Sequence, residues 1–282
     1  MRPLLCSGPA DHSRVVGGVF SLQFQISIPE MKLIMWKTNN NLLCFSNGEL
    51  EATFNVANPG AGITNICVKN EPLAGLSILQ CHNAGAAPDP EDNVVEFYVR
   101  EDDLVATYQQ SPKRANRKQI YLRQAGLYFE EPINGFELVF SMQTQRLDGD
   151  PELMIRSEFD CPKIFALANP ASPAWQMIES PEDACELLPE DYCGSFAVAL
   201  AGTNQMYFQV IDPSDFLGAR IIRLSDDADR FILSMPVFGN SLEKGVIRRG
   251  RASGFFLSGG DEFARATRFY DWYRASAPSL TT

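Results

Sequence analysis

Residues 93–124 read NVVEFYVREDDLVATYQQSPKRANRKQIYLRQ and hold the clearest strand signals of the chain. Segments 94–100 and 104–108 are rich in β-branched and aromatic residues, which favour strands. The Glu-Asp-Asp between them suits a tight polar turn, so the two segments predict a hairpin. Alternation resumes over residues 119–123, which predicts a third strand and therefore a three-stranded meander.

The run between the second and third strands, residues 111–118, predicts a basic loop. Pro112 has no amide hydrogen for a strand ladder, and the charges that follow it need water. In a chain of formal net charge −11, this region carries a dense group of cations: Lys113, Arg114, Arg117, Lys118 and Arg123. Two interpretations remain open, a solvated loop that keeps a sheet edge from pairing with neighbours and a loop that faces a ligand.

The composition bounds the class of protein. With 282 residues, 45% of them hydrophobic and 11% aromatic, the chain can bury a large core, which excludes disorder along its whole length. All-β proteins often reach this size as one body, so we expect a single domain over 1–282, with a loose tail at 1–14, a β-sandwich body at 15–257 and a helix at 261–275. The negative charge argues against a nucleic-acid partner, because a phosphate backbone would be repelled everywhere except at the basic loop.

The cysteines and histidines indicate neither disulfides nor a metal. Seven cysteines lie in mostly apolar segments without a C-x-x-C pair, and the two histidines, His12 and His82, have no metal-ligand spacing. We therefore expect mostly buried, reduced thiols and no cofactor or metal. Gly8, Pro9 and Asp11 interrupt any apolar run near the start, and no later run is long enough to span a membrane, so we expect a cytoplasmic protein without a membrane partner.

The rest of the chain is mostly β by the same criteria. Turn residues such as Ser46-Asn47-Gly48 and Gly202-Thr203-Asn204 separate strand-like segments, and residues 84–92 predict a flexible loop. Further strands are predicted at 15–28, 42–45, 50–56, 63–68, 135–145, 153–159, 195–201, 206–211, 221–224, 231–238 and 245–257.

Two segments depart from this pattern. Residues 161–192 contain prolines at 162, 170, 173, 181 and 189, which predicts a long irregular connection that either covers a site or only a surface. Residues 261–275 predict an amphipathic helix with Asp261 as its N-cap, because apolar residues recur at helical spacing until Pro278. The apolar positions are Phe263, Ala266, Phe269, Tyr270 and Tyr273.

We therefore expect an all-β fold, mainly antiparallel, in the form of a large β-sandwich or distorted barrel with one C-terminal α-helix. Three parts of the sequence carry a resemblance: Gly48-x-Leu50-x-Ala52-Thr53-Phe54, YVREDDLVATYQQSP at 98–112, and LEKGVIRRGRASGFFL at 242–257. Over residues 42–257 the chain resembles uncharacterised bacterial proteins of the galactose-mutarotase-like supersandwich. The resemblance implies that fold and a groove that faces a carbohydrate.

The catalytic pattern of that fold is not matched. Its aldose epimerases use a glutamate base with two histidines, whereas here His12 lies in the expected tail and His82 precedes a flexible loop. No catalytic residue of the epimerases is therefore assigned in this chain. His82 is interpreted as a structural residue, and Glu96 as an exposed strand residue. The motifs G-x-S-x-G, P-loop and H-E-x-x-H are absent, and adjacent acids such as Glu130-Glu131 would point to opposite faces of a strand.

The aromatic residues that could stack on a sugar are Trp36, Tyr98, Tyr108, Tyr121, Trp175 and Trp272. Tyrosine faces beside arginine forks suit hydroxyl-rich or acidic sugars, which makes one ligand-binding set the best candidate: Tyr108, Arg114, Arg117, Tyr121 and Arg123.

Three functions remain open: a carbohydrate-binding sandwich without assigned catalysis, a saccharide-active enzyme of the epimerase or lyase type, and a structural or assembly subunit. Clustering of the set around a groove would favour the first two, and an acid within hydrogen-bond reach would favour the enzyme. The sequence leaves the ligand, the oligomeric state and the catalytic residues unknown.

Overall fold

A computed structural model describes residues 35–83, 93–109, 116–126, 129–145, 147–149, 153–179, 183–224, 229–239 and 241–276. All of them belong to one unit, Leu33–Thr282. The strand predicted at 15–28 and the loop predicted at 84–92 lie outside these ranges, and the single domain over 1–282 stays a prediction.

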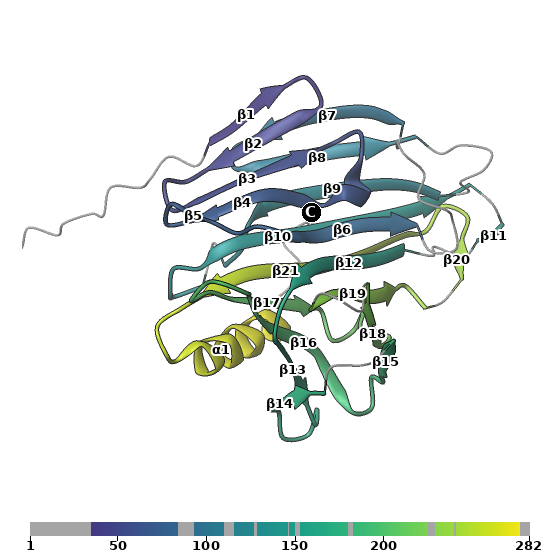
Figure 1. Ribbon diagram of the computed structural model, residues 1–282. Coiled ribbons are helices and arrows are strands. Elements are labelled where there is room, and N and C mark those ends of the chain that lie inside the picture. Colours follow the sequence, from purple (N-terminus) through teal and green to yellow (C-terminus); the bar gives the residue numbers. More distant parts are fainter. Residues whose placement is uncertain are drawn as a thin grey trace, which may run out of the picture. The chain divides into compact units, whose positions relative to one another are not determined.

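The described strands form two large antiparallel sheets and one short ribbon (Figure 1). Sheet I has the order β1-β2-β3-β4-β6-β12-β19-β18-β15, with β5 beside β4. Its strands are β1 (Met35–Asn39), β2 (Leu42–Ser46), β3 (Leu50–Asn55), β4 (Ile63–Val68), β5 (Glu71–Pro72), β6 (Ser77–Asn83), β12 (Leu153–Asp160), β19 (Arg230–Val237), β18 (Ala219–Arg223) and β15 (Ala184–Leu187). A 3₁₀ turn, η1 (Pro59–Ala61), precedes β4.

Sheet II has the order β14-β13-β16-β17-β21-β10-β9-β8-β7. Its strands are β14 (Ala174–Ile178), β13 (Lys163–Ala168), β16 (Tyr192–Ala199), β17 (Met206–Ile211), β21 (Ile247–Leu257), β10 (Asn134–Thr144), β9 (Asn116–Gln124), β8 (Asp103–Tyr108) and β7 (Val94–Arg100). The ribbon pairs β11 (Asp148–Gly149) with β20 (Leu242–Glu243). The predicted antiparallel β-sandwich is therefore confirmed.

The main core lies between the inner faces of the two sheets, because strand side chains alternate between faces. In β12, Leu153, Ile155 and Phe159 are buried, whereas the residues between them, such as Met154 and Arg156, are only half-buried. The two sheets meet through side chains from both: Phe45 of β2 and Phe136 of β10 pack edge to face with ring centroids 4.9 Å apart. Burial of this apolar surface supplies most of the stability of such a sandwich.

The helix α1 (Glu262–Ala275) confirms the prediction for 261–275. Its buried side chains Ala266, Phe269, Tyr270 and Tyr273 form a second hydrophobic cluster with residues of sheet II, and Phe269 lies 4.4 Å from Phe255 between ring centroids. Asp261 is at the N-cap but its side chain makes no capping hydrogen bond. The carboxylate of Glu262 instead accepts a hydrogen bond from the Gly260 amide at 2.9 Å.

The predicted meander is present as β7, β8 and β9, but the predicted basic loop is shorter than expected. β9 begins at Asn116, so Arg117 and Lys118 belong to the strand. A strand can hold both cations because they point to opposite faces. Arg117 is exposed, and the buried Lys118 ammonium lies over the Tyr108 ring, 4.9 Å from its centroid.

The prediction of a long irregular connection over 161–192 is wrong. This part of the chain contains β13, β14 and β15, which extend both sheets. Prolines break a ladder only inside a strand, and here Pro162, Pro170, Pro173 and Pro189 lie between the strands. The prolines therefore mark the turns of this segment.

The cysteines are less uniformly buried than predicted. Cys81, Cys161 and Cys193 are buried, Cys67 and Cys185 are half-buried, and Cys44 is exposed; all six are free, and Cys6 lies outside the described residues.

We expect every cysteine of the purified chain to react as a thiol after denaturation without reductant, because the described ones form no disulfide. Intact mass after alkylation, compared with a sample reduced first, checks this. A mass deficit in the unreduced sample would show disulfides and would contradict the expected reducing compartment.

Candidate functional site

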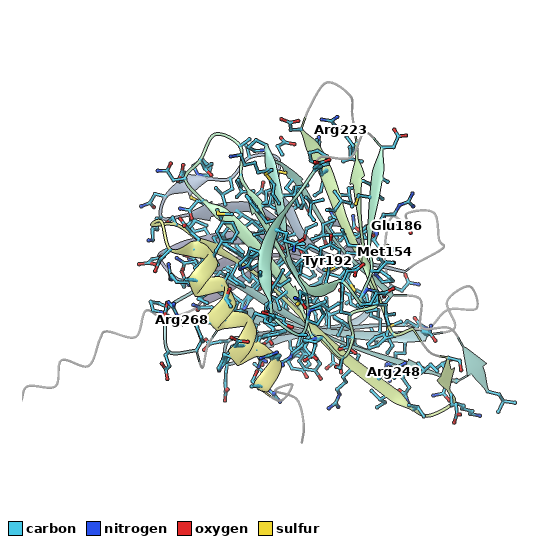
Figure 2. All side chains as sticks on the ribbon, turned by 90° about the horizontal axis from the view of Figure 1, so that it is seen from below. Met154, Glu186, Tyr192, Arg223, Arg248 and Arg268 are labelled. Carbon is cyan, nitrogen blue, oxygen red and sulfur yellow. The ribbon has the colours of Figure 1, made fainter. Side chains whose placement is uncertain are left out.

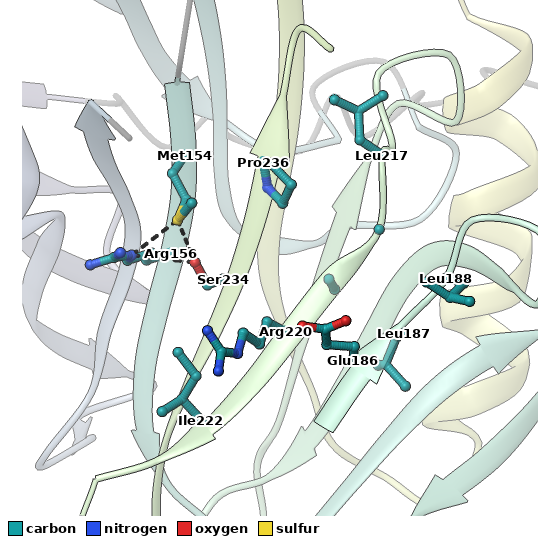
Figure 3. Close-up of a pocket in the computed structure, with 12 residues that line it drawn as sticks. Met154, Arg156, Glu186, Leu187, Leu188, Leu217, Arg220, Ile222, Ser234 and Pro236 are labelled. Carbon is teal, nitrogen blue, oxygen red and sulfur yellow. Dashed lines mark hydrogen bonds between the residues drawn. The ribbon is translucent and has the colours of Figure 1, made fainter. Parts of the chain in front are cut away.

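A cavity of about 310 Å³ opens on the outer face of sheet I, over β12, β19, β18 and β15 (Figure 3). Its volume is at the lower end of the range for small-molecule sites, which suits a ligand of about one ring. The lining residues are Met154, Arg156, Glu186, Leu187, Leu188, Leu217, Gly218, Ala219, Arg220, Ile222, Ser234 and Pro236. Figure 2 shows Met154 and Glu186 on one side of the molecule and α1 with Arg268 on the other.

Strand register assembles the polar lining into a single row. Arg156 of β12 pairs with Ser234 of β19, Ser234 pairs with Arg220 of β18, and Arg220 pairs with Glu186 of β15. Directly paired residues present their side chains on the same face of a sheet. Four polar side chains from four strands therefore lie side by side across the cavity, which we call the polar row.

Arg156 is held in place by its neighbours in β12 and β19. Its Nε donates to Ser234 Oγ at 3.3 Å and to Met154 Sδ at 3.3 Å, and Ser234 is almost fully buried. Burial lowers the pKa of the Arg156 guanidinium. An arginine stays charged at neutral pH even so, and the row keeps a fixed cation at its β12 end.

The floor beside the polar row is apolar. Met154 pairs with Pro236 in the neighbouring row, Ile222 is half-buried on β18, and Leu188 and Leu217 are exposed at the rim. An apolar floor crossed by hydrogen-bonding groups can hold a ligand that has both C–H surface and oxygen atoms.

His82 lies next to the cavity, on β6, where it pairs with Met154. Its Nε2 is 3.1 Å from Gln80 Oε1. Burial, with smaller contributions from Arg156 and Lys118, lowers the pKa of His82 to about 4. The ring is therefore neutral at pH 7. His12 lies outside the described residues, so a two-histidine site is not formed within the part of the chain that the structure describes.

The predicted ligand set is divided between two faces of sheet II. Tyr108 points into the core, is 2% exposed, and has a hydroxyl without a hydrogen-bond partner among the described residues. Burial raises its pKa well above the usual tyrosine value. Arg114 lies outside the described residues.

Arg117, Tyr121 and Arg123 share the outer face of sheet II, because they occupy alternate positions of β9. The Tyr121 hydroxyl donates to Gln119 Oε1 at 2.8 Å, and Arg117 is exposed. Arg123 is buried and its Nε donates to Glu137 Oε2 at 2.7 Å. Glu137 is thus within hydrogen-bond reach of the predicted set, but it is already paired with Arg123 and both residues are buried.

Sequence reasoning missed the polar row. Alternation over 153–159 does place Arg156 opposite the core residues of its strand. Its partners could not be found, because β15 lies in the segment interpreted as irregular. The row also joins strands that are far apart in the sequence.

Among the described residues no group of three or more His, Cys, Asp or Glu side chains could hold a metal ion. None of the helices in the described ranges is long and apolar enough to cross a membrane.

No family model matches the sequence, and no curated protein matches it. Solved structures do resemble it. A TPR-domain containing protein from Parabacteroides distasonis has a TM-score of 0.57 at 8% identity, with 86% of this chain and 49% of that chain covered. The chain thus spans about half the length of that protein.

A putative aldose 1-epimerase from Klebsiella pneumoniae has a TM-score of 0.50 at 11% identity over 86% of this chain and 87% of that chain. A galactose mutarotase-like protein from Lactobacillus casei has a TM-score of 0.48 at 10% identity over 79% and 100%. Identities this low show the fold alone. The chain has the galactose-mutarotase-like supersandwich fold.

Proposed function

We propose that the protein binds a saccharide in the cavity on the outer face of sheet I. The observation that carries the proposal is the polar row, which crosses an apolar floor inside a cavity of about 310 Å³. A sugar ring offers C–H faces to such a floor and vicinal hydroxyls to arginine forks, a carboxylate and a hydroxyl. The fold shared with a putative aldose 1-epimerase is compatible with this ligand class.

The lining also limits the size of the ligand. None of the described residues that line the cavity is aromatic. Stacked binding of several sugar rings relies on exposed aromatic faces, which the described lining does not offer. A single sugar ring, hydrogen-bonded at its edges to the polar row, fits this lining better than an oligosaccharide.

Filling the cavity should abolish binding. We expect Ile222→Trp to weaken the best sugar from a thermal-shift screen by at least about ten-fold, because a half-buried isoleucine of the floor is replaced by a larger ring. Isothermal titration calorimetry measures the affinities. Ile247→Trp is the matched control, since Ile247 is an exposed strand residue of sheet II and should leave binding unchanged.

Equal affinities of wild type, Ile222→Trp and Ile247→Trp for the sugar would show that it does not bind in this cavity. The predicted set of Tyr108, Arg114, Arg117, Tyr121 and Arg123 stays a proposal; of its described members, Arg117 and Tyr121 lie on the outer face of sheet II without the core burial of Tyr108. Titrating the same sugar against Arg114→Lys and Arg117→Lys tests it, because lysine keeps the charge but loses the guanidinium fork.

The alternatives are a saccharide-active enzyme and a structural subunit. Neither is supported by an observation as strong as the polar row. Glu186 is the one carboxylate among the described residues that line the cavity, so the described lining lacks the pair of acids that glycoside hydrolysis uses. His82 beside it is neutral at pH 7 and supplies no imidazolium as a second acid. A cytoplasmic location is part of the proposal and depends on the thiol measurement.

A further inference from the structure

Arg156 differs from four other half-buried or buried arginines. Each of the four has a carboxylate oxygen within hydrogen-bond reach: Arg123 (Glu137, 2.7 Å), Arg223 (Asp229, 3.2 Å), Arg251 (Asp212, 3.0 Å) and Arg265 (Glu131, 3.1 Å). In the described chain Arg156 pairs with no acid. Its Nε contacts Ser234 and Met154, and its two terminal amino groups have no partner there.

The acidic residues near Arg156 do not neutralise its positive charge. Glu158 lies on the same face of β12, two residues along, but it pairs with Arg230. Glu186, at the far end of the polar row, is the cross-strand partner of Arg220. Figure 3 shows the Arg220 guanidinium between Arg156 and Glu186. Two arginines face one glutamate in the row, and in the described chain neither forms an ion pair with it, so the row carries net positive charge; Arg156 is the more buried of the two cations.

A guanidinium that has lost part of its water and has no counter-charge raises the free energy of the empty site. An anionic ligand supplies the missing partner. The terminal amino groups of Arg156 form a fork that matches the paired oxygens of a carboxylate or a phosphate. The neighbours of Arg156 across β6 are Gln80 and, in the next row, the neutral His82, which add no negative charge against such a ligand.

We propose that the cavity selects an anionic monosaccharide, whose acid group pairs with Arg156 while its ring lies on the apolar floor. This inference rests on the proposed saccharide function and names its substrate class. The acid group is either the carboxylate of a uronic acid or a phosphate ester, because both present oxygens that fit the same fork.

The test compares sugars that differ only in the acid group. Glucuronate, glucose 6-phosphate and glucose are titrated calorimetrically against wild type, Arg156→Gln, Arg156→Lys and the control Arg117→Gln. In wild type we expect at least one acidic sugar to bind about ten-fold or more tightly than glucose. Arg156→Gln should remove that preference, so that the acidic sugars and glucose bind this variant about equally, Arg156→Lys should keep part of the preference, and Arg117→Gln should keep all of it.

Each other outcome has a distinct meaning. Equal affinity for glucose and both acidic sugars in wild type would overturn the anionic inference and leave the saccharide function standing. Binding of none of the three sugars would overturn both. Acetate or inorganic phosphate that binds as tightly as the acidic sugars would show an adventitious ion only and overturn the inference. Preference for glucuronate or for glucose 6-phosphate identifies the acid group. Melting curves of Arg156→Gln and Arg156→Lys show whether each variant is folded.

Discussion

A chain that ends at Ser258 is expected to lose its cooperative melting transition. The deletion removes α1, which buries Phe269, Tyr270 and Tyr273 against sheet II. Burial of a large apolar side chain contributes about 1.5–3 kcal/mol, so these three account for roughly 5–9 kcal/mol. That is comparable to the whole stability of a typical domain, about 5–15 kcal/mol. The deletion also exposes Phe208 and Phe255, which are fully buried in the same cluster.

Circular dichroism during heating measures the effect, and a point variant makes it quantitative. Phe269→Ala should cost about 3–5 kcal/mol, since this fully buried ring contacts Phe129, Phe255 and Trp272. Asp271→Ala, on the exposed side of the helix, is the control and should change stability by less than about 0.5 kcal/mol. A truncated chain that melts within a degree or two of the full one would make α1 an appendage.

The helix and the hairpins could be predicted because their signals are local. In α1 the apolar residues recur every three or four positions, and in β7 and β8 two strand-like segments flank three acids. The segment 161–192 could not be predicted, because its strands are short and each lies between prolines or turns. Only their pairing with β16 and β18 shows them to be strands, and pairing is not a local property.

The candidate sites show the same limit. The predicted ligand set combined residues that are close in the sequence, but Tyr108 faces the core while Tyr121 faces outward. Lys118 was expected in a basic loop that is either solvated or ligand-facing, and Arg123 in the ligand-binding set, yet both are buried, one against the Tyr108 ring and the other against Glu137. Charge in a sequence does not reveal a buried partner. The polar row required the order β12-β19-β18-β15, which joins residues 156, 234, 220 and 186.

Arg251 of β21 is the other residue whose loss should be severe, because it is a charged side chain that is 2% exposed. Its Nε donates to Asp212 Oδ2 at 3.0 Å, and one Nη donates to the Ser276 carbonyl at 2.6 Å and also to the Tyr273 carbonyl. The guanidinium lies 4.0 Å from the centroid of the Tyr273 ring. One cation thus pairs with the half-buried Asp212 and satisfies carbonyls at the end of α1, where the helix dipole is negative.

We expect Arg251→Ala to lower the free energy of unfolding by about 3–5 kcal/mol, because removing one member of a buried ion pair leaves the acid without its partner. Urea unfolding followed by fluorescence gives this value. Arg249→Ala is the matched control, two residues earlier on the same strand and exposed, and should cost at most about 1 kcal/mol. Equal losses for the two variants would contradict the role assigned to Arg251.

A second measurement separates the two tasks of Arg251. If its bonds to the Tyr273 and Ser276 carbonyls hold the helix end, amide hydrogen exchange in Arg251→Ala should accelerate first in the last turn of α1, below the denaturant range of global unfolding. Arg251→Lys keeps the charge near Asp212 but lacks the fork that reaches both carbonyls, so it should recover part of the stability and little of the protection at the helix end. Full recovery of both by lysine would mean that charge alone, without the fork, fixes α1 to sheet II.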